Sequence, residues 1–177
     1  ESIFKFDKIL KVFKISSSDI TNVPLLKEIG KRKKHVLLST GASSVEEIRF
    51  AIKKLNLPNH KICIMHCVLN YPTEDKNANL LYIKTLKKKF PKNIIGYSDH
   101  TSPDENLLSL HVAYSLGAQI IEKHFTFDKK IKGNDHYHSA DKRDMKKYFN
   151  FQKKILTLKG IGSISLNSQK KSIKNAR

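Results

Sequence analysis

Five short apolar segments rich in β-branched residues recur along the chain, and each is followed by a segment with helical spacing. The apolar segments cover residues 11–15, 35–39, 61–68, 93–98 and 119–125. Strand followed by helix, repeated five times, predicts β/α units on a parallel sheet with right-handed crossovers. An open doubly wound sheet and a (β/α)8 barrel both fit this rhythm. No strand is followed by a glycine-rich dinucleotide loop, because the nearest candidate, "STGASS", lacks the G-x-G-x-x-G spacing.

The segments between the strands carry apolar residues at helical spacing. In "SSVEEIRFAIKKLN", Ser43 and Glu46 are predicted to form a capping box. Gly117 is predicted to end a helix, and a last helix is predicted from near Asp141 to about Leu158. The expected apolar faces are Val45, Ile48, Ile52 and Leu55 after the second strand; Leu80, Ile83 and Phe90, with Leu86 at the edge, after the third; and Leu107, Leu110, Val112 and Tyr114 after the fourth.

The chain carries a large positive charge. Its 177 residues contain 34 Lys and Arg against 16 Asp and Glu, a formal net charge of +18. Such a balance favours a polyanionic partner, but most of the charge is Lys, which lacks a bidentate base-reading fork. The lysines also lie on predicted helix faces and in the tail. We therefore favour a solvated lysine coat and expect no nucleic-acid partner, with a basic nucleic-acid-binding module as the alternative.

Length and hydropathy indicate one domain that does not enter a membrane. The composition is 39% hydrophobic, as in globular proteins, and no apolar run approaches the ~20 residues that span a bilayer. The chain begins at Glu1 without a secretory signal, which predicts a reducing, cytoplasmic location. Cys63 and Cys67 would lie about 13 Å apart along one strand, so we expect buried structural thiols and not a shared metal ion.

Polar, chemically useful side chains follow each predicted strand. In chain order they are Lys14 with Ser16, Ser17 and Ser18; Ser39 with Thr40; His66 with Asn70 and Tyr71; Ser98 with Asp99 and His100; and Glu122 with His124. The carboxyl ends of parallel strands form the ligand face of an α/β sheet. One convergent site is therefore expected.

Side-chain parity sharpens this expectation. Strand residues two apart face the same way, so Ser98 aligns with His100 and Glu122 with His124. The two strands are consecutive, so the two imidazoles can meet at the rim and bind Mn²⁺, Mg²⁺ or Zn²⁺. The alternative is that both are packed core histidines. One lysine with several hydroxyls and a glycine turn suits a phosphate, although Ser and Gly also serve as ordinary turn and cap residues.

At these residues the chain resembles the sialic acid synthases and their relatives. The matching stretches are "FKISSSDITNVPLLKEIG", "LSTGASSVEEI", "HCVLNYPT", "NANL", "IIGYSDHT", "GAQIIEKHFTFDK" and "GNDHYHS", in order over roughly residues 10 to 140. The resemblance implies a (β/α)8 TIM barrel followed by a small antifreeze-like domain. It also implies a synthase that condenses phosphoenolpyruvate with an N-acetylated amino sugar, such as N-acetylmannosamine or a diacetamido-trideoxyhexose, to give a nine-carbon sugar acid. "HCVLNYPT" and "GNDHYHS" are more similar to the legionaminate and spore-coat polysaccharide branch.

The resemblance also implies roles for individual residues. The metal ligands would be His100 and His124, holding Mn²⁺ or Mg²⁺. The phosphoenolpyruvate contacts would be Lys14, Ser17, Ser39 and Ser98, and the groups facing the acceptor sugar would be Tyr71, Glu122 and Asp135. Of these, Lys14 and Glu122 are expected to act in catalysis. The divalent ion would polarise the aldehyde of the acceptor, water would add at C2, and phosphate would leave by C–O cleavage.

The chain departs from the family pattern in two respects. Leu69 stands where some relatives have Asn, which leaves open the phosphate contact from that strand. The five strands resemble the fourth to eighth of the barrel, so the first strands and the antifreeze-like domain have no counterpart. We expect a partial barrel over residues 1–160, a basic linker over 161–177, and little activity from the isolated chain. The full-length parent would be a homodimer, and a truncated non-catalytic remnant is the alternative.

Overall fold

The structure, a computed structural model, describes residues 2–133, 135–163 and 166–176. Within them, one parallel sheet has the order β1-β2-β3-β4-β5. Its strands are β1 (Val12–Ile15), β2 (His35–Ser39), β3 (Ile62–His66), β4 (Ile94–Asp99) and β5 (Ile120–Lys123). The predicted parallel β/α sheet is confirmed. The strand order follows the chain in one direction, as in a barrel wall, whereas a doubly wound sheet reverses direction at its switch point.

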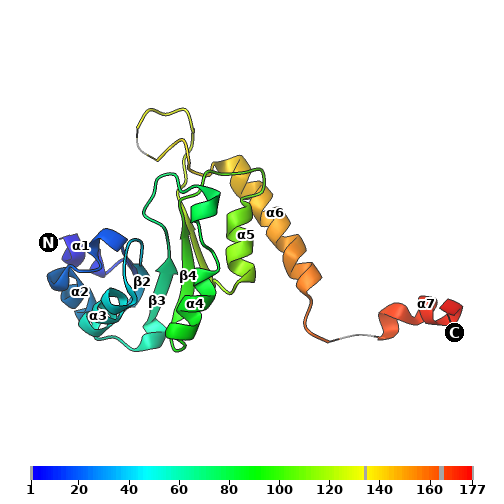
Figure 1. Cartoon of the computed structure of the whole chain (residues 1–177), viewed down its shortest axis with the longest axis horizontal. Coiled ribbons are helices and arrows are strands. Elements are labelled where there is room, and N and C mark those ends of the chain that lie inside the picture. Colours follow the sequence, from blue (N-terminus) through cyan, green and yellow to red (C-terminus); the bar gives the residue numbers. More distant parts are fainter. Residues whose placement is uncertain (1, 134, 164–165, 177) are drawn as a thin grey trace.

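The main helices lie in chain order along the sheet (Figure 1). They are α2 (Val23–Lys31), α3 (Val45–Leu55), α4 (Tyr82–Lys89), α5 (Leu108–Ser115) and α6 (Lys142–Lys159). The short 3-10 helices are η1 (Ser17–Asp19), η2 (Asn59–Lys61), η3 (Asp75–Asn77) and η4 (Leu166–Gln169). Two short helices have no counterpart among the predicted ones: α1 (Ser2–Asp7), and α7 (Lys170–Ala176), which lies well away from the sheet in Figure 1.

The sheet has two chemically different faces. The face toward the helices is apolar and holds the core, with Phe13, Ile15, Val36, Leu38, Ile62, Ile64, Ile95 and Tyr97 packed against helix residues such as Leu26, Ile48, Leu55, Ile83 and Leu110. By strand alternation and the observed register, the opposite, inner face carries Lys14, Leu37, Ser39, Cys63, Met65, Gly96, Ser98 and Glu122. Lys14, Ser39, Ser98 and Glu122 therefore share one face of the sheet.

Gly96 allows the inner face to pack closely. A Cβ atom built on Gly96 would lie 2.3 Å from Met65 Sδ and 2.8 Å from the carbonyl oxygen of Ile120. Both atoms come from neighbouring strands, so any larger residue would push β3 and β5 away from β4. The glycine of the "GYSDHT" stretch thus has a packing role.

Most predicted helix boundaries are confirmed, with one correction. Asp141 is the N-cap of α6, and Gly117 follows α5 with φ +106°. The capping box of α3 is formed by Ser44 and Glu47, not by Ser43 and Glu46, because the helical backbone begins one residue later than predicted. Ser43 Oγ instead donates to the carbonyl oxygen of Gly41.

The predicted apolar face of α5 is wrong at one position. Val112 is 37% exposed, while His111 and Ala113 are buried. Leu107 has a left-handed backbone (φ +54°), so the helix begins after it and its buried face is set by Leu110 and its helical neighbours. The expected faces of α3 and α4 are confirmed.

No described helix combines the length and hydropathy that a bilayer crossing requires. The assignment of the five strands to barrel positions four to eight, and the boundary at residue 160, remain predictions.

Candidate active site at the carboxyl ends of the strands

The polar residues at the strand ends fall on two faces, not one. Ser98 and His100 face inward, while Asp99 faces the helices and lies in a buried network. Asp99 pairs with Lys123 at 2.7 Å (Oδ2 to Nζ) and accepts a hydrogen bond from the Tyr97 hydroxyl at 2.6 Å. His66 also lies outside the inner face, with its Nε2 2.9 Å from the carbonyl oxygen of Ala78. The expectation that every strand-end group converges is therefore wrong for Asp99 and His66, which have structural partners.

Three of the expected site residues contact one another directly. Lys14 Nζ lies 3.4 Å from Glu122 Oε1, and Ser98 Oγ donates to the same oxygen at 2.9 Å. Lys14 comes from β1, Ser98 from β4 and Glu122 from β5, so the contact crosses the inner face between its two outer strands. One cation and one hydroxyl therefore meet at a single carboxylate oxygen, through an ion pair and a hydrogen bond.

Ser17 and Ser39 lie at the ends of β1 and β2, beside this group on the rim. Both are buried, and Ser39 Oγ has no hydrogen-bond partner among the described residues. A Cβ on Gly41 would lie 3.1 Å from Ser17 Oγ, so the glycine lets the backbone approach the serine closely. Among the described residues, no hydrogen bond links Ser39 Oγ to Lys14 or Ser98. Ser17 and Ser39 contribute hydroxyl groups and a glycine turn to the same edge of the sheet.

His100 and His124 meet at the rim, as the parity argument predicted. Their ring centroids are 5.4 Å apart, and Tyr71 packs on His100 with ring centroids 4.2 Å apart. His100 Nδ1 lies 2.7 Å from the carbonyl oxygen of Val68, which can only accept, so Nδ1 carries the proton and Nε2 has its lone pair free. Burial lowers the pKa of His100, which favours this neutral, ligand-competent form.

Asp135 and His138, in the loop after β5, lie beside His124. Asp135 Oδ2 lies 3.6 Å from His124 Nδ1, and its Oδ1 lies 3.6 Å from His138 Nε2. His138 is fully buried, and burial lowers its pKa. A hollow of about 360 Å³ opens beside these residues and is lined by Tyr71, His124, Asp135 and Tyr137.

These residues fit a divalent cation. His124, Asp135 and His138 each offer a ligand atom, and these atoms lie within 4.8 Å of one another. The sequence motifs predict no role for His138 and assign Asp135 to the acceptor sugar. The stretch "GNDHYHS" does indicate a possible metal site, because three potential ligands fall within four residues. Side-chain alternation applies to strands, so it could not place these residues in a loop.

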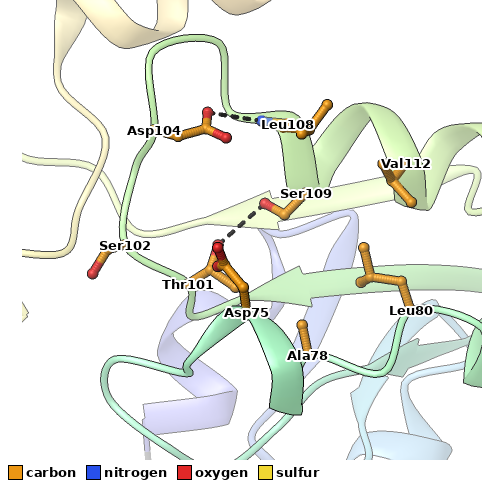
Figure 2. Close-up of a pocket in the computed structure, with 9 residues that line it drawn as sticks. All are labelled: Asp75, Ala78, Leu80, Thr101, Ser102, Asp104, Leu108, Ser109 and Val112. Atoms are coloured by element: carbon orange, nitrogen blue, oxygen red, sulfur yellow. Dashed lines mark hydrogen bonds between the residues drawn. The ribbon is translucent and has the colours of Figure 1, made fainter.

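A separate pocket lies outside the sheet, between η3, the loop after β4 and α5 (Figure 2). Two of its polar side chains are already engaged. Thr101 Oγ1 donates to Ser109 Oγ, and Asp104 Oδ1 accepts from the amide of Leu108. Its lining contains two carboxylates, Asp75 and Asp104, and no Lys, Arg or His side chain, so it offers no positive charge to a phosphate or carboxylate ligand.

The sequence of this chain matches the family model of the NeuB family over residues 3–163. The match spans the whole sheet and every residue of the site described above. The chain belongs to the NeuB family. The resemblance drawn from the sequence motifs is thereby confirmed.

Relatives of this NeuB-family chain include named synthases. An N,N'-diacetyllegionaminic acid synthase of Campylobacter jejuni is 41% identical over 143 residues, which is 77% of this chain and 41% of that protein. An uncharacterised protein of Methanocaldococcus jannaschii is 44% identical over 168 residues, covering 93% of this chain and 48% of its own length. The chain thus spans about half the length of these relatives or less.

Solved structures agree on the fold. A sialic acid synthetase of Leptospira borgpetersenii, solved in complex with citrate, superposes with a TM-score of 0.78 at 33% identity, over 94% of this chain and 57% of that one. A truncated 3-deoxy-D-arabino-heptulosonate 7-phosphate synthase of Thermotoga maritima superposes with a TM-score of 0.73 at 20% identity, a likeness of fold alone. The five-stranded sheet of this chain is therefore a curled partial barrel.

Proposed function

We propose that this chain is part of a synthase that condenses phosphoenolpyruvate with an N-acetylated amino sugar to form a nine-carbon sugar acid and phosphate. The observation that carries the proposal is the joint placement of Lys14, Ser98 and Glu122 on the inner face, next to the rim where His100 and His124 meet. A cation and hydroxyl groups suit the phosphate, and paired imidazoles suit a divalent ion. Its membership of the NeuB family and the names of its relatives support the same reaction class.

Lys14, with Ser17, Ser39 and Ser98, is assigned to the phosphoenolpyruvate side. Lys14 is the only full positive charge of these four, so it supplies most of the attraction for the phosphate. Ser39 Oγ, buried without a described partner, has its hydrogen-bonding capacity free for a ligand oxygen.

The acceptor side is assigned to Tyr71, Glu122 and Asp135. Tyr71 and Asp135 line the hollow beside His124, which gives the sugar access to the histidines. A bound Mn²⁺ or Mg²⁺, held by His100 Nε2 and His124, would supply Lewis-acid polarisation of the acceptor aldehyde. Glu122, held between Lys14 and Ser98, stands where it can take or return a proton during the condensation.

The five strands are assigned to positions four to eight of an eight-stranded barrel. In this sheet, β1 and β5 each have one described neighbour, so each leaves an edge of unpaired backbone groups. We expect the isolated chain to be inactive and prone to aggregate, and a homodimeric parent to carry the activity. A non-catalytic remnant is the second candidate, which the same open edges favour.

A barrel chimera tests the proposal. Residues 10–140 of this chain would replace the matching segment of the Campylobacter N,N'-diacetyllegionaminic acid synthase. The expected result is sugar-acid formation from phosphoenolpyruvate that requires a divalent ion. It should be lost in His124→Ala and kept in His60→Ala, since His60 is exposed in η2, which precedes β3 and so lies at the amino end of that strand, away from the carboxyl-end rim. A folded, monodisperse chimera that forms no product would support the remnant.

A further inference from the structure

The loop between β5 and α6 is closed at its base by backbone hydrogen bonds. The amide of Ala140 donates to the carbonyl oxygen of His124 at 2.9 Å, and the amide of Thr126 donates to that of Ala140 at 2.9 Å. These bonds return the chain to the end of β5. The second arm of the loop therefore places His138 beside His124, with ring centroids 5.4 Å apart.

His138 lies in an unusual environment. Its side chain has 0% exposure, and neither ring nitrogen has a hydrogen-bond partner within the described part of the chain. Buried imidazoles are normally hydrogen-bonded, because an unmade bond leaves the desolvation of the group uncompensated. A buried polar side chain without a partner, facing a carboxylate and a second histidine, indicates a missing ligand.

The distances in this cluster fit a shared ion better than hydrogen bonds. Each nitrogen-to-oxygen separation from Asp135, to His124 and to His138, is 3.6 Å, beyond hydrogen-bonding distance. Two ligands bound tetrahedrally to one cation at ~2.1 Å lie about 3.4 Å apart. An ion can therefore join all three groups with small movements of their side chains.

We propose that Asp135 and His138 are protein ligands of the divalent ion together with His124. The inference rests on the ion site of the proposed function: His124 belongs to both, Asp135 moves from the acceptor side to the ion, and His138 is new. These three residues form one ligand set beside His100. Two imidazoles and one carboxylate favour a transition metal such as Mn²⁺, Fe²⁺ or Zn²⁺ over Mg²⁺, which prefers oxygen ligands and its own water. Three protein ligands also hold the ion before any acceptor sugar binds.

The test is a Mn²⁺ titration of the whole 177-residue chain without substrates. Electron paramagnetic resonance measures the binding of the added Mn²⁺. We expect one ion per chain. His138→Ala and Asp135→Asn should each raise the Kd at least tenfold. The matched control is His136→Ala in the same loop, whose ring nitrogen is bonded to Thr126 Oγ1; it should leave the Kd unchanged. An equal effect of His136→Ala would mean that only loop integrity was measured, which would overturn the proposal.

The visible absorption of bound Co²⁺ separates a ligand from a positioning residue. His138→Ala should change the ligand-field bands of bound Co²⁺. A raised Kd with unchanged bands would overturn the assignment of His138 as a ligand. If His138→Ala fails to fold, Asp135→Asn carries the test, because that side chain is 43% exposed. Excess Mg²⁺ should not displace Mn²⁺, and ready displacement would count against the inference.

His124→Ala distinguishes the two proposals. Loss of Mn²⁺ binding in His124→Ala with no change in His138→Ala and Asp135→Asn would overturn the further inference alone. If the unsubstituted chain binds no Mn²⁺, the ion site is contradicted in the proposed function as well as in the further inference.

Discussion

Lys14 Nζ lies 3.4 Å from Glu122 Oε1, although the two residues belong to the first and the last strand of the sheet. In a flat sheet of this order, strands β1 and β5 would be about 19 Å apart, four interstrand spacings. The contact therefore requires a curled sheet, and it brings a cation and a carboxylate together on the inner face. Both side chains are about one-third exposed, so a ligand can reach them.

Lys14→Ala should weaken phosphoenolpyruvate binding selectively. A hydrogen bond to a charged group contributes about 1.5–3 kcal/mol, so the apparent KM for phosphoenolpyruvate in the chimera should rise about tenfold to a hundredfold. The KM for the sugar should change little. Lys11→Ala, an exposed lysine just before β1, is the matched control and should behave as the parent chimera does. Equal changes in both KM values would count against the assignment.

Ser44→Ala should destabilise the fold more than Ser43→Ala. Ser44 Oγ accepts from the amide of Glu47, and the Glu47 carboxylate accepts from the amide of Ser44. Loss of an N-cap costs about 1 kcal/mol in the free energy of unfolding. Ser43 caps no helix, so its substitution should have a smaller effect in urea denaturation. The reverse order would show that the capping box was misassigned.

Gly96→Ala should destabilise the sheet by about 1–3 kcal/mol, as overpacking does. The added methyl group would meet Met65 Sδ and the carbonyl oxygen of Ile120. Truncation of Met65 to Ala removes the nearer contact, so the double variant should lose less stability than the sum of the single ones. Simple additivity in thermal or urea unfolding would contradict this packing account.

Cys63 should resist thiol reagents while the protein is folded. Burial raises the pKa of its thiol from 9.0 to about 12, so the reactive thiolate is nearly absent at neutral pH. In Cys67→Ala, which leaves one thiol, labelling should be slow in buffer and fast in denaturant. Labelling at the rate of a free cysteine in the folded state would contradict the assignment.

The same pKa shift gives a pH dependence with a definite sign. A folded pKa above the unfolded one adds stability below pH 9.0, and this contribution is lost as pH rises toward about 12. The free energy of unfolding should therefore fall across that window. The fall should be smaller in a Cys63→Ala variant, and equal falls would assign the effect to other groups.

Strand periodicity predicts the inner-face part of the site but not its loop part. Alternation alone placed Ser98, His100, Glu122 and His124 on one face. The same rule distinguishes Asp99, which has the opposite parity and a buried partner in Lys123. His138 could not be placed in this way. Its position depends on the backbone bonds that close the loop onto His124, and that loop has no periodic pattern.

Helix boundaries were predictable only to within one or two residues. The precision is limited because two adjacent serines can each act as the N-cap. Ser43 and Ser44 are chemically equivalent, and only the backbone conformation decides which of them caps α3. His66 shows a second limit. Its partner, the carbonyl oxygen of Ala78, is twelve residues away in an irregular segment that no local pattern specifies.

The most direct test of the central claim, that one rim holds both a divalent ion and phosphoenolpyruvate, is phosphorus NMR relaxation of phosphoenolpyruvate by Mn²⁺ bound to the chimera. The account predicts strong relaxation enhancement beyond that of Mn²⁺ and phosphoenolpyruvate without protein. It should persist in Lys11→Ala, weaken in Lys14→Ala and disappear in His124→Ala. An enhancement that neither the Lys14 nor the His124 substitution alters would contradict the account.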